Sequence, residues 1–549
     1  MIDRRLLTLL IAFMAGLAIV ASRLVFIQTV QAEKYDRLAR KQRLRSVSLA
    51  PQRGIIFDRE GEILAMSEDV LTIYATPYFI TNASGLSAKL SPLLRINRKT
   101  LYRRLTRPGG FSYIARKVRL PVAKKIQAME VPGLGFAPDT LRRYPNGRLA
   151  SHVLGFVGMD NRGLAGTELY YDQLLGGREG KLVAEQDPAG RPIPGSVEKR
   201  VDPVNGQTLQ LTIDRHIQYK AEAELDAAVK QFGAAGGTIV VMDPETGELL
   251  ALASAPSFDP NNFTKAPAES LTNRAVVDAY EPGSTMKMVT AAAALEEGIA
   301  KPGTKYFLQS TIRVADRTIH EAHDRAAREF TLTDIVSHSS NVGAVTLGLK
   351  LGRNRLYEYI ESFGLTKRTG VDFKGESPGI MPPPEKWSAS TIGNVPFGQG
   401  IAATPLQMTQ AMGIVANGGC LVRPHLLLKA GGPDAPGRSV ERKRVLSSKV
   451  AAQMRTILQK AVSEGTGQAA RLEGYEIGGK TGTAQKAPYG SGKYLASFIG
   501  FAPASRPKLV VLVAIDEPTN AIYGGVVAAP AFASVTEFAL KHLRIPPKP

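Results

Sequence analysis

The chain has 549 residues, 44% of them hydrophobic and 21% charged, and a formal net charge of +20. This length predicts two or three globular domains, and the charge indicates an anionic partner or surface. Nucleic acid is not the expected partner, because the sequence has no zinc-finger spacing, RNP-like aromatic motif or basic region joined to heptads. An anionic membrane face and an acidic polymer fit the charge equally well. The single cysteine, Cys420, excludes an internal disulfide.

An apolar segment near the N-terminus predicts a membrane anchor. Residues 6–22 carry no charge, and apolar character resumes after Arg23. The segment is longer than the ~7–15 apolar residues of a cleaved signal peptide and about long enough to span a bilayer. We therefore expect an uncleaved signal anchor over residues 6–28, preceded by a tail of residues 1–5; a cleaved signal peptide is the alternative. Basic residues flank both ends, so the positive-inside rule leaves the orientation open.

The region from residue 29 to residue 208 predicts a structural module of mixed α and β. A hairpin is expected from Arg53 to Ala65, where two apolar strands flank a polar turn. Two basic clusters, Lys34–Arg53 and Arg95–Arg119, stand out. A solvated helix and a lipid-headgroup contact explain the first cluster equally well. The region shows no combination of nucleophile, base and oxyanion donor, so we do not expect it to be catalytic.

From Leu209 onward, helices precede and follow a set of β-strands. Asp214 is placed to cap an amphipathic helix, whose apolar face carries Ile217, Ala221, Leu225 and Val229. The later elements are the strands Thr238–Met242, Glu248–Ala253, Phe498–Phe501 and Leu509–Ile515, and the helix Phe532–Leu543. This order predicts an α/β domain in which helices sandwich an antiparallel sheet, rather than a doubly wound parallel sheet.

A short segment of this domain carries a potentially reactive pair. Pro282 and Gly283 precede an almost entirely apolar helical pattern, which predicts a buried helix from Ser284. Lys287 lies three residues further on, so both side chains share a helix face with Cβ atoms about 5–6 Å apart. Burial lowers the pKa of a lysine, and a neutral amine beside a hydroxyl is a base beside a nucleophile. Alone the pattern is weak, because a capping serine and a lysine reaching solvent look the same.

Two later motifs change that interpretation. Ser339 and Asn341 stand at a break between two expected helices, Leu332–His338 and Val342–Leu349. The segment Lys480–Thr483 reads K-T-G-T and opens an expected strand. The order S-x-x-K, S-x-N, K-T-G is a known signature of serine acyl-transfer enzymes. Three such motifs in order, within one domain, make coincidence improbable.

Acyl transfer assigns a role to each of these side chains. Ser284 supplies the nucleophilic oxygen, and neutral Lys287 takes its proton. The Ser339 hydroxyl can relay that proton to the departing amine. Asn341 can orient Lys287 and donate a hydrogen bond to a substrate amide. These four residues are therefore the expected catalytic centre, together with the positive charge of Lys480.

The K-T-G-T strand is expected to bind the substrate. Lys480 supplies positive charge for a substrate carboxylate, and Thr481 and Thr483 lie beside it, the latter with a hydroxyl for that carboxylate. Gly482 is expected to let the substrate backbone approach the strand edge, where a peptide can add as a further strand. Backbone N–H groups at Ser284 and Thr483 are candidate oxyanion donors, and losing one such donor costs about 3–4 kcal/mol in other acyl enzymes.

These motifs resemble those of the class B penicillin-binding proteins, most closely the cell-division type, FtsI. The resemblance covers nearly the whole chain and includes Arg53–Ala65, Arg143-Tyr144-Pro145, Gly166-Thr167-Glu168, Gly398-Gln399-Gly400, Thr404–Gln407 and Asp516–Phe532. It implies a penicillin-binding D,D-transpeptidase of peptidoglycan biosynthesis. Such an enzyme cleaves a D-Ala–D-Ala bond of a stem peptide, holds the acyl group on Ser284 and passes it to the amine of a neighbouring strand.

The resemblance also implies an organisation and a location. Residues 1–5 would be a cytoplasmic tail, 6–28 a single-pass anchor in the cell inner membrane, 29–208 a pedestal (dimerisation) domain and 209–549 a periplasmic transpeptidase domain at the division septum. The implied partners are stem peptides, β-lactams, an FtsW-type glycosyltransferase and other division proteins. Neither a cofactor nor a metal is implied, and nothing resembles a glycosyltransferase domain.

Several alternatives share part of the pattern. A serine β-lactamase has the three motifs but needs neither the anchor nor the region up to Thr212. A D,D-carboxypeptidase uses water as the acceptor, which a sequence does not show. A non-catalytic β-lactam sensor or division scaffold needs a cytoplasmic signalling module. His320, His323 and Asp324 could suggest a metal, but a polar loop is the preferred interpretation, and His338 is interpreted as structural because Lys287 already supplies a base.

Overall fold

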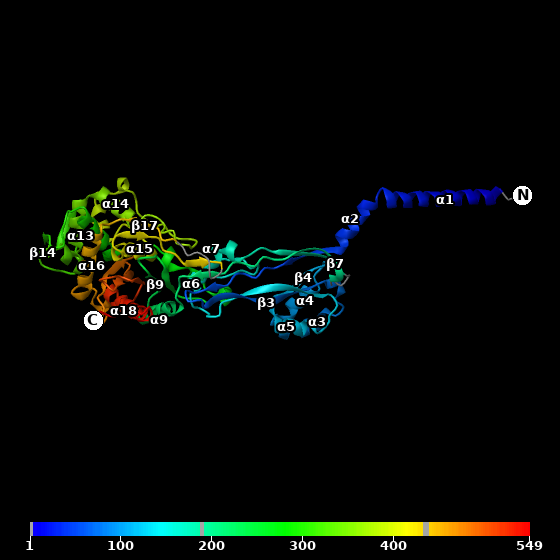
Figure 1. Ribbon diagram of the computed structural model, residues 1–549, viewed down its shortest axis with the longest axis horizontal. Helices are drawn as coiled ribbons and strands as arrows, with labels where there is room; N and C mark the ends of the chain where they lie inside the picture. The colour runs from blue at the N-terminus through cyan, green and yellow to red at the C-terminus, as the bar shows by residue number, and fades with distance from the viewer. Residues whose placement is uncertain (1–3, 187–191, 432–438, 549) are drawn as a thin grey trace. The chain divides into compact units, whose positions relative to one another are not determined.

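The computed structural model describes residues 4–186, 192–431 and 439–548 (Figure 1). Most of the tail predicted at residues 1–5 lies outside the described residues. Residue contacts divide the chain into two units. Unit 1 comprises Met1–Arg53, Ser67–Leu141 and Gly177–Gly206, and unit 2 comprises Gly54–Met66, Arg142–Gly176 and Gln207–Pro549. Both units are assembled from separate chain segments, and the boundary predicted between residues 208 and 209 stays a prediction.

The N-terminal apolar segment forms a single long helix. Helix α1 spans Arg4–Thr29, and its side chains are almost all exposed. Within the described ranges it is the one helix long and apolar enough to cross a membrane, which suggests a single-pass anchor. The basic cluster that follows is only partly helical, because α2 (Ala32–Arg43) gives way to strand β1 (Leu44–Leu49).

Unit 1 combines strands and helices, as the prediction of a mixed α and β module required. Its strands are β1, β6 (Gly180–Gln186) and β7 (Pro192–Val201), which form an antiparallel sheet in the order β1-β6-β7, and β4 (Ser112–Arg119), which pairs antiparallel with β3 (Ile63–Ala75). Strand β5 (Leu134–Arg143) also pairs with β3. Helices α3 (Ala83–Leu94), α4 (Arg98–Leu105) and α5 (Leu120–Gln127) bury Leu90, Leu101 and Ile126 with the strand residues Ile73 and Ile114.

A five-stranded antiparallel sheet forms the centre of unit 2. Its strands, in spatial order, are β10 (Leu249–Ala255), β9 (Gly236–Met242), β20 (Leu509–Asp516), β19 (Tyr494–Ala502) and β18 (Gly478–Gln485). Strand β18, which carries the K-T-G-T motif, therefore lies at an edge of the sheet, as predicted.

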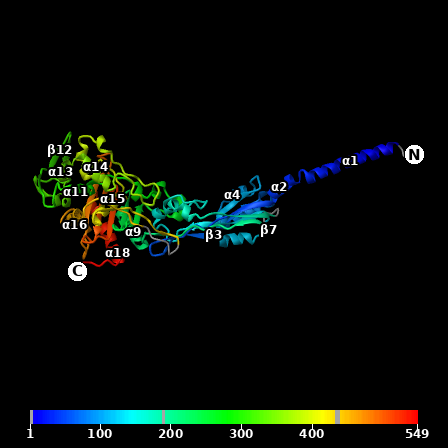
Figure 2. The same ribbon diagram turned by 45° about the horizontal axis from the view of Figure 1, so that its top comes forward.

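Helices cover both faces of this sheet, so the predicted sandwich is confirmed. Alternate residues of β20 belong to different cores: Val511 and Val513 pack with α9 (Arg215–Phe232) and α18 (Ala529–His542), which lie side by side in Figures 1 and 2. Val510 and Leu512 face α15 (Pro405–Ala416) and α16 (Ser448–Ser463). Asp214 caps α9 as expected, since its Oδ1 accepts hydrogen bonds from the N–H groups of His216 and Ile217.

The predicted hairpin joins this unit through a second sheet. Strands β2 (Ile56–Phe57) and β3 pair antiparallel around the polar turn, and β2 also pairs in parallel with β8 (Leu209–Leu211). On its other side β8 pairs with β16 (Leu427–Ala430). Ile56 and Leu64 of the hairpin are buried in the same core as the serine-bearing helix. This part of the chain therefore belongs to the body that holds the catalytic motifs.

A buried ion pair joins Arg142, which precedes the Arg143-Tyr144-Pro145 motif, to Glu168 of the Gly166-Thr167-Glu168 motif. Arg142 Nε donates to Glu168 Oε1 at 2.6 Å, and the two side chains are 4% and 0% exposed. The Arg142 guanidinium also donates to the Gly54 carbonyl at 2.8 Å, and the Tyr144 hydroxyl lies 3.4 Å from Glu168. Because a buried charge needs a partner, this pair holds the segment around Arg142 against the segment that ends at Glu168.

We expect Glu168→Gln to destabilise unit 2. The substitution removes the carboxylate next to a buried guanidinium, and breaking one side of a buried pair costs about 3–5 kcal/mol. Urea unfolding of wild type and variant would measure the difference. Glu537→Gln is the matched control, because Glu537 pairs with Lys541 on the exposed face of α18 and should leave the midpoint nearly unchanged. Equal midpoints for both variants would contradict the prediction.

Candidate active site

The serine stands on a tight turn that leads into a buried helix. The turn is a 3₁₀ segment, Gly283–Met286, and α11 runs from Lys287 to Glu296. Helical structure thus begins about where the sequence predicted, although its first turn is 3₁₀. Gly283 has φ +55°, and its N–H donates to the Gly398 carbonyl at 3.1 Å. A Cβ on Gly398 would collide with the Gly283 backbone, so the G-Q-G motif fixes the position of the serine turn.

The Lys287 amine is the centre of the site. Its side chain is 1% exposed. Its Nζ lies 3.1 Å from Ser284 Oγ, 3.1 Å from Ser339 Oγ, 2.5 Å from the Ser339 carbonyl and 2.8 Å from Asn341 Oδ1. The carbonyl and the amide oxygen can only accept, so they take the two N–H groups of a neutral amine. The nitrogen lone pair is then left for a hydroxyl proton, which is the arrangement a base requires.

The electrostatics of the site favour the neutral amine. Burial lowers the pKa of Lys287 well below its usual range, and the charge of Lys480 lowers it further, whereas Glu321 raises it. Desolvation is the largest of these effects because α11 is buried on every side. The neutral lysine expected from the sequence stays a prediction, which the burial of Lys287 and the charge of Lys480 both favour.

The S-x-N motif lies at the junction of two helices and contacts the Lys287 amine. Helix α12 (Leu332–Ser337) ends before Ser339, which adopts a left-handed conformation with φ +60°, and α13 (Asn341–Leu351) begins directly afterwards. A left-handed non-glycine residue costs about 1–2 kcal/mol. This sharp reversal presents both the carbonyl and the hydroxyl of Ser339 to Lys287.

The K-T-G-T strand contributes a second buried lysine. Lys480 is 0% exposed, and its Nζ donates to the Thr481 carbonyl at 3.1 Å and to Thr481 Oγ1 at 3.2 Å. Burial lowers the pKa of Lys480 to about 7. Thr481 Oγ1 also bonds Thr466 Oγ1 at 2.7 Å, and Thr483 Oγ1 accepts from the Gly524 N–H at 3.1 Å. Burial therefore disfavours the charged form of Lys480, a point that the sequence did not indicate.

Gly482 has a packing role in addition to the substrate role expected from the sequence, which stays a prediction. A Cβ on Gly482 would collide with Ser497 and lie 3.2 Å from the Pro282 carbonyl and 3.1 Å from the Thr285 methyl group. Gly283 in turn lies close to the Thr483 carbonyl. The missing side chain thus lets the serine turn lie directly against the strand. This contact brings the first and third motifs together, while Lys287 joins the first and second.

Two acidic residues of the site have no role in the sequence analysis. Glu281 Oε1 accepts from the Gly400 N–H at 2.9 Å and from the Tyr489 hydroxyl at 2.8 Å, which ties the serine turn to two loops. Glu321 accepts from the Asn341 N–H at 2.6 Å. Glu281 adjoins the serine motif, so its position was a usable signal. Glu321 lies 20 residues before Asn341, and no local pattern connects them.

The histidines considered in the sequence lie around the site rather than in it. The His320 carbonyl accepts a hydrogen bond from Asn341, and the His323 ring packs against Tyr523 at 5.8 Å. His338 is exposed, and its ring contacts Ser337 and Phe330. In the part of the chain that the structure describes, no group of three His, Cys, Asp or Glu side chains could hold a metal ion.

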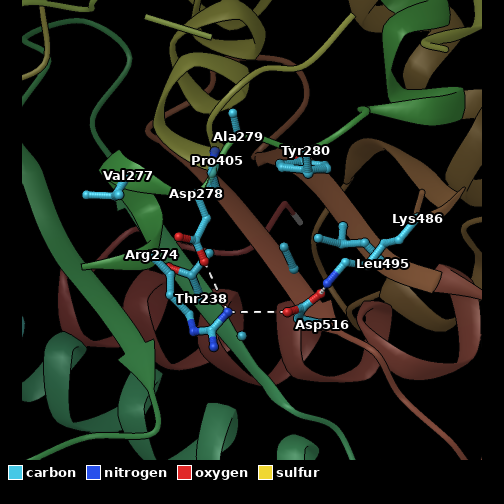
Figure 3. Close-up of a pocket in the computed structure, with 12 residues that line it drawn as sticks. Thr238, Arg274, Val277, Asp278, Ala279, Tyr280, Pro405, Lys486, Leu495 and Asp516 are labelled. Atoms are coloured by element: carbon cyan, nitrogen blue, oxygen red, sulfur yellow. Dashed lines mark hydrogen bonds and ion pairs between the residues drawn. The ribbon is translucent and has the colours of Figure 1, made fainter. Parts of the chain in front are cut away.

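A separate pocket of about 380 Å³ opens beside the sheet without containing a catalytic side chain (Figure 3). Arg274 lies between Asp278 and Asp516, at 3.0 and 3.3 Å, and Lys486 contacts Asp516 at 2.6 Å. These charges compensate one another, so the pocket presents no net charge to a ligand. Its ion pairs join Arg274 and Lys486, the residue after β18, to Asp516 at the end of β20.

Comparison with known proteins places this geometry in context. The family model for the penicillin-binding protein transpeptidase domain matches residues 237–537, and the model for the penicillin-binding protein dimerisation domain matches residues 48–211. Stage V sporulation protein D of Bacillus subtilis is 36% identical over 100% of this chain and 87% of its own length. Peptidoglycan D,D-transpeptidase FtsI of Escherichia coli is 33% identical over 97% of this chain and 90% of its own length.

Solved structures show the same similarity. A peptidoglycan synthetase from Bifidobacterium adolescentis has a TM-score of 0.76 and 27% identity, and the match covers 92% of this chain and 98% of that one. Penicillin-binding protein 3 of Mycobacterium tuberculosis, in complex with aztreonam, has a TM-score of 0.72 and 28% identity over the same shares of the two chains.

We expect Gly482→Ala to impair acylation of Ser284 by a labelled penicillin more than it impairs folding. The added methyl group pushes the serine turn from the strand, and overpacking of this kind costs about 1–3 kcal/mol. The acylation rate per folded molecule, with a thermal melt beside it, would measure both effects. Gly490→Ala, on an open loop with no atom near its Cβ position, controls for a general loss of glycine, although its φ of +91° adds local strain. Wild-type acylation by Gly482→Ala would contradict the packing role.

Proposed function

The chain belongs to the class B penicillin-binding proteins, and from this membership we propose how its own residues act as a peptidoglycan D,D-transpeptidase. The transpeptidase cross-links stem peptides through an acyl-enzyme on Ser284. One observation supports this most strongly: the buried Lys287 amine lies 3.1 Å from Ser284 Oγ. A serine next to a neutral amine is the minimum that nucleophilic acyl transfer needs.

Acylation follows from the contacts of Lys287. The amine takes the Ser284 proton as Oγ attacks the carbonyl of the terminal D-Ala–D-Ala bond. Ser339 Oγ, also 3.1 Å from Nζ, passes a proton to the departing D-Ala amine. Asn341 keeps Lys287 oriented through its Oδ1. An amine of a neighbouring strand then attacks the acyl-enzyme, and the serine leaves with its proton restored through the same groups.

Substrate binding is assigned to the edge strand. The stem peptide lies along β18, where the edge of the sheet is open to a further strand. The charge of buried Lys480 attracts the terminal carboxylate of the peptide, and the hydroxyls of Thr481 and Thr483 donate hydrogen bonds to that carboxylate. Gly482 contributes by keeping the strand close to the serine turn. A β-lactam occupies the same place and acylates the same oxygen.

The location and the partners extend the proposal. Residues 6–28 anchor the chain in the inner membrane, the pedestal domain spans 29–208 and the transpeptidase domain, 209–549, lies in the periplasm at the division septum. The curated relatives FtsI and stage V sporulation protein D support a role in septal wall synthesis. An FtsW-type glycosyltransferase and other division proteins are the partners. Neither of the two matched domains is a glycosyltransferase domain.

Labelling with a fluorescent penicillin tests the assignment of the nucleophile. We expect one adduct per chain, on Ser284, and none in Ser284→Ala. Ser339 lies equally close to Lys287, but Ser284 stands on the turn that packs against the strand assigned to the substrate. Mass spectrometry of the labelled peptides locates the adduct. An adduct on another residue, or equal labelling of the variant, would overturn the assignment. Release of a stem-peptide acyl group to an added amine distinguishes a transpeptidase from a carboxypeptidase.

The two buried lysines predict a bell-shaped dependence of the acylation rate constant on pH. The rate rises as pH passes the pKa of Lys287, because only the neutral amine is a base. It falls as pH rises through the pKa of Lys480, about 7, because neutral Lys480 no longer attracts a carboxylate. Measurement at limiting penicillin reports the free enzyme.

Substitution of Lys480 assigns the alkaline limb of that profile. Lys480→Arg keeps its charge, so we expect the limb to move upward in pH by about 2 units or more, since an arginine stays protonated to pH ~12. Lys493 is an exposed lysine that directly precedes β19, so Lys493→Arg should leave the alkaline limb in place. An unchanged limb in Lys480→Arg would show that another group titrates there.

A further inference from the structure

A buried glutamate supports the S-x-N motif from outside the three catalytic motifs. Glu321 follows strand β13 (Arg317–His320), which forms a small hairpin with β12 (Thr311–Val314). Its side chain is only 6% exposed. The hairpin is a two-stranded sheet separate from the central sheet, and Glu321 is the residue that directly follows it.

The carboxylate of Glu321 binds the first residues of α13. Its Oε2 accepts from the Asn341 N–H at 2.6 Å, and its Oε1 accepts from the Ser340 hydroxyl at 2.5 Å. Ser340 is also the N-cap of α13, since its Oγ accepts from the Gly343 N–H at 2.9 Å. The first N–H groups of a helix lack intrahelical partners, and a negative charge is favoured beside them. Glu321 therefore fixes the start of α13.

The residue before Glu321 fixes the side chain of Asn341. The His320 carbonyl accepts from Asn341 Nδ2 at 3.0 Å, while Asn341 Oδ1 accepts from Lys287 at 2.8 Å. The dipeptide His320–Glu321 thus holds both the backbone and the amide of Asn341. The amide oxygen is left to face the lysine amine.

Arg325 anchors Glu321 in turn. Its guanidinium donates to Glu321 Oε1 at 2.6 Å and, at 3.0 Å each, to the carbonyls of Leu308 and Gln309. The guanidinium also lies 4.6 Å from the centre of the Phe330 ring. These contacts tie the carboxylate to the surrounding strands and give it a charged partner inside the protein.

We propose that Glu321 is a positioning residue of the acyl-transfer site, which holds the turn Ser339–Asn341 in the conformation that keeps Lys287 within reach of Ser284. This inference rests on the proposed transpeptidase function. Glu321 makes no contact with the nucleophile and acts through Asn341 and Ser340. Among the described charged groups, Lys480 and Glu321 act on Lys287 with opposite sign, and Glu321 raises the pKa of Lys287. Removing the Glu321 carboxylate should therefore change both the position of the turn Ser339–Asn341 and the pKa of Lys287.

The test separates these effects with three variants of the full chain in detergent. Glu321→Gln removes the charge, and Glu321→Asp keeps the charge but shortens its reach. Glu329→Gln is the matched control, because Glu329 lies in the same region, is 60% exposed and pairs with the exposed Lys305. The acylation rate of titrated active sites by a fluorescent penicillin is measured from pH 5 to pH 10, so unfolded molecules do not enter the rate.

We expect the rate per active site to fall about 10- to 100-fold in Glu321→Gln and Glu321→Asp, which is the cost of a misplaced catalytic group. The acid limb should move to lower pH in Glu321→Gln, stay in place in Glu321→Asp and remain at wild type in Glu329→Gln. A wild-type rate per active site in both Glu321 variants, or a loss of titratable sites with the rate and the pH profile unchanged, would overturn the proposal. Absence of acylation in the wild-type protein would instead refute the proposed function.

Discussion

The burial of the Lys287 amine among oxygen acceptors is the constraint on which the catalytic unit depends. A cation without water costs several kcal/mol, so the amine favours its neutral form. That form offers two N–H groups and one lone pair, and the Ser339 carbonyl and Asn341 accept the two N–H groups. The lone pair then points to a hydroxyl. The surrounding helices are apolar for the same reason, because polar neighbours would rehydrate the base.

The close approach of the serine turn to the edge strand follows from this burial. Small residues allow it: Gly398 lies against Gly283, and Gly482 leaves room for Pro282. A turn held between a loop and a strand has little freedom to move away from its lysine. The second lysine, Lys480, is a fully buried residue of that strand, and its burial lowers its pKa, so a substrate carboxylate would favour its charged form. Binding of a carboxylate and protonation of Lys480 are therefore coupled.

Outer layers of polar contacts hold these elements in place. The hairpin that carries Glu321 fixes the start of α13, and the Arg142–Glu168 pair fixes segments far from the site within the same unit. In both places a buried carboxylate accepts from an arginine; Glu321 also accepts from the Asn341 N–H, and Arg142 donates to the Gly54 carbonyl. From the sequence, Glu168 was named only as a motif residue, and the neighbourhood of Glu321 was considered only for metal binding. The substrate role expected of Gly482 stays a prediction, and its missing side chain leaves room for Ser497 and the serine turn.

The sequence by itself determined the features whose cause is local. The apolar run of α1, the N-cap at Asp214 and the break between α12 and α13 depend on neighbours a few residues away. The three motifs likewise revealed the reaction, since each is a short fixed spacing. Only the tertiary structure decided which residues surround Lys287, how deeply Lys480 is buried and that Glu321 reaches Asn341. Such contacts join segments that are distant in sequence, and a single carboxylate leaves no periodic trace by which its partner could be found.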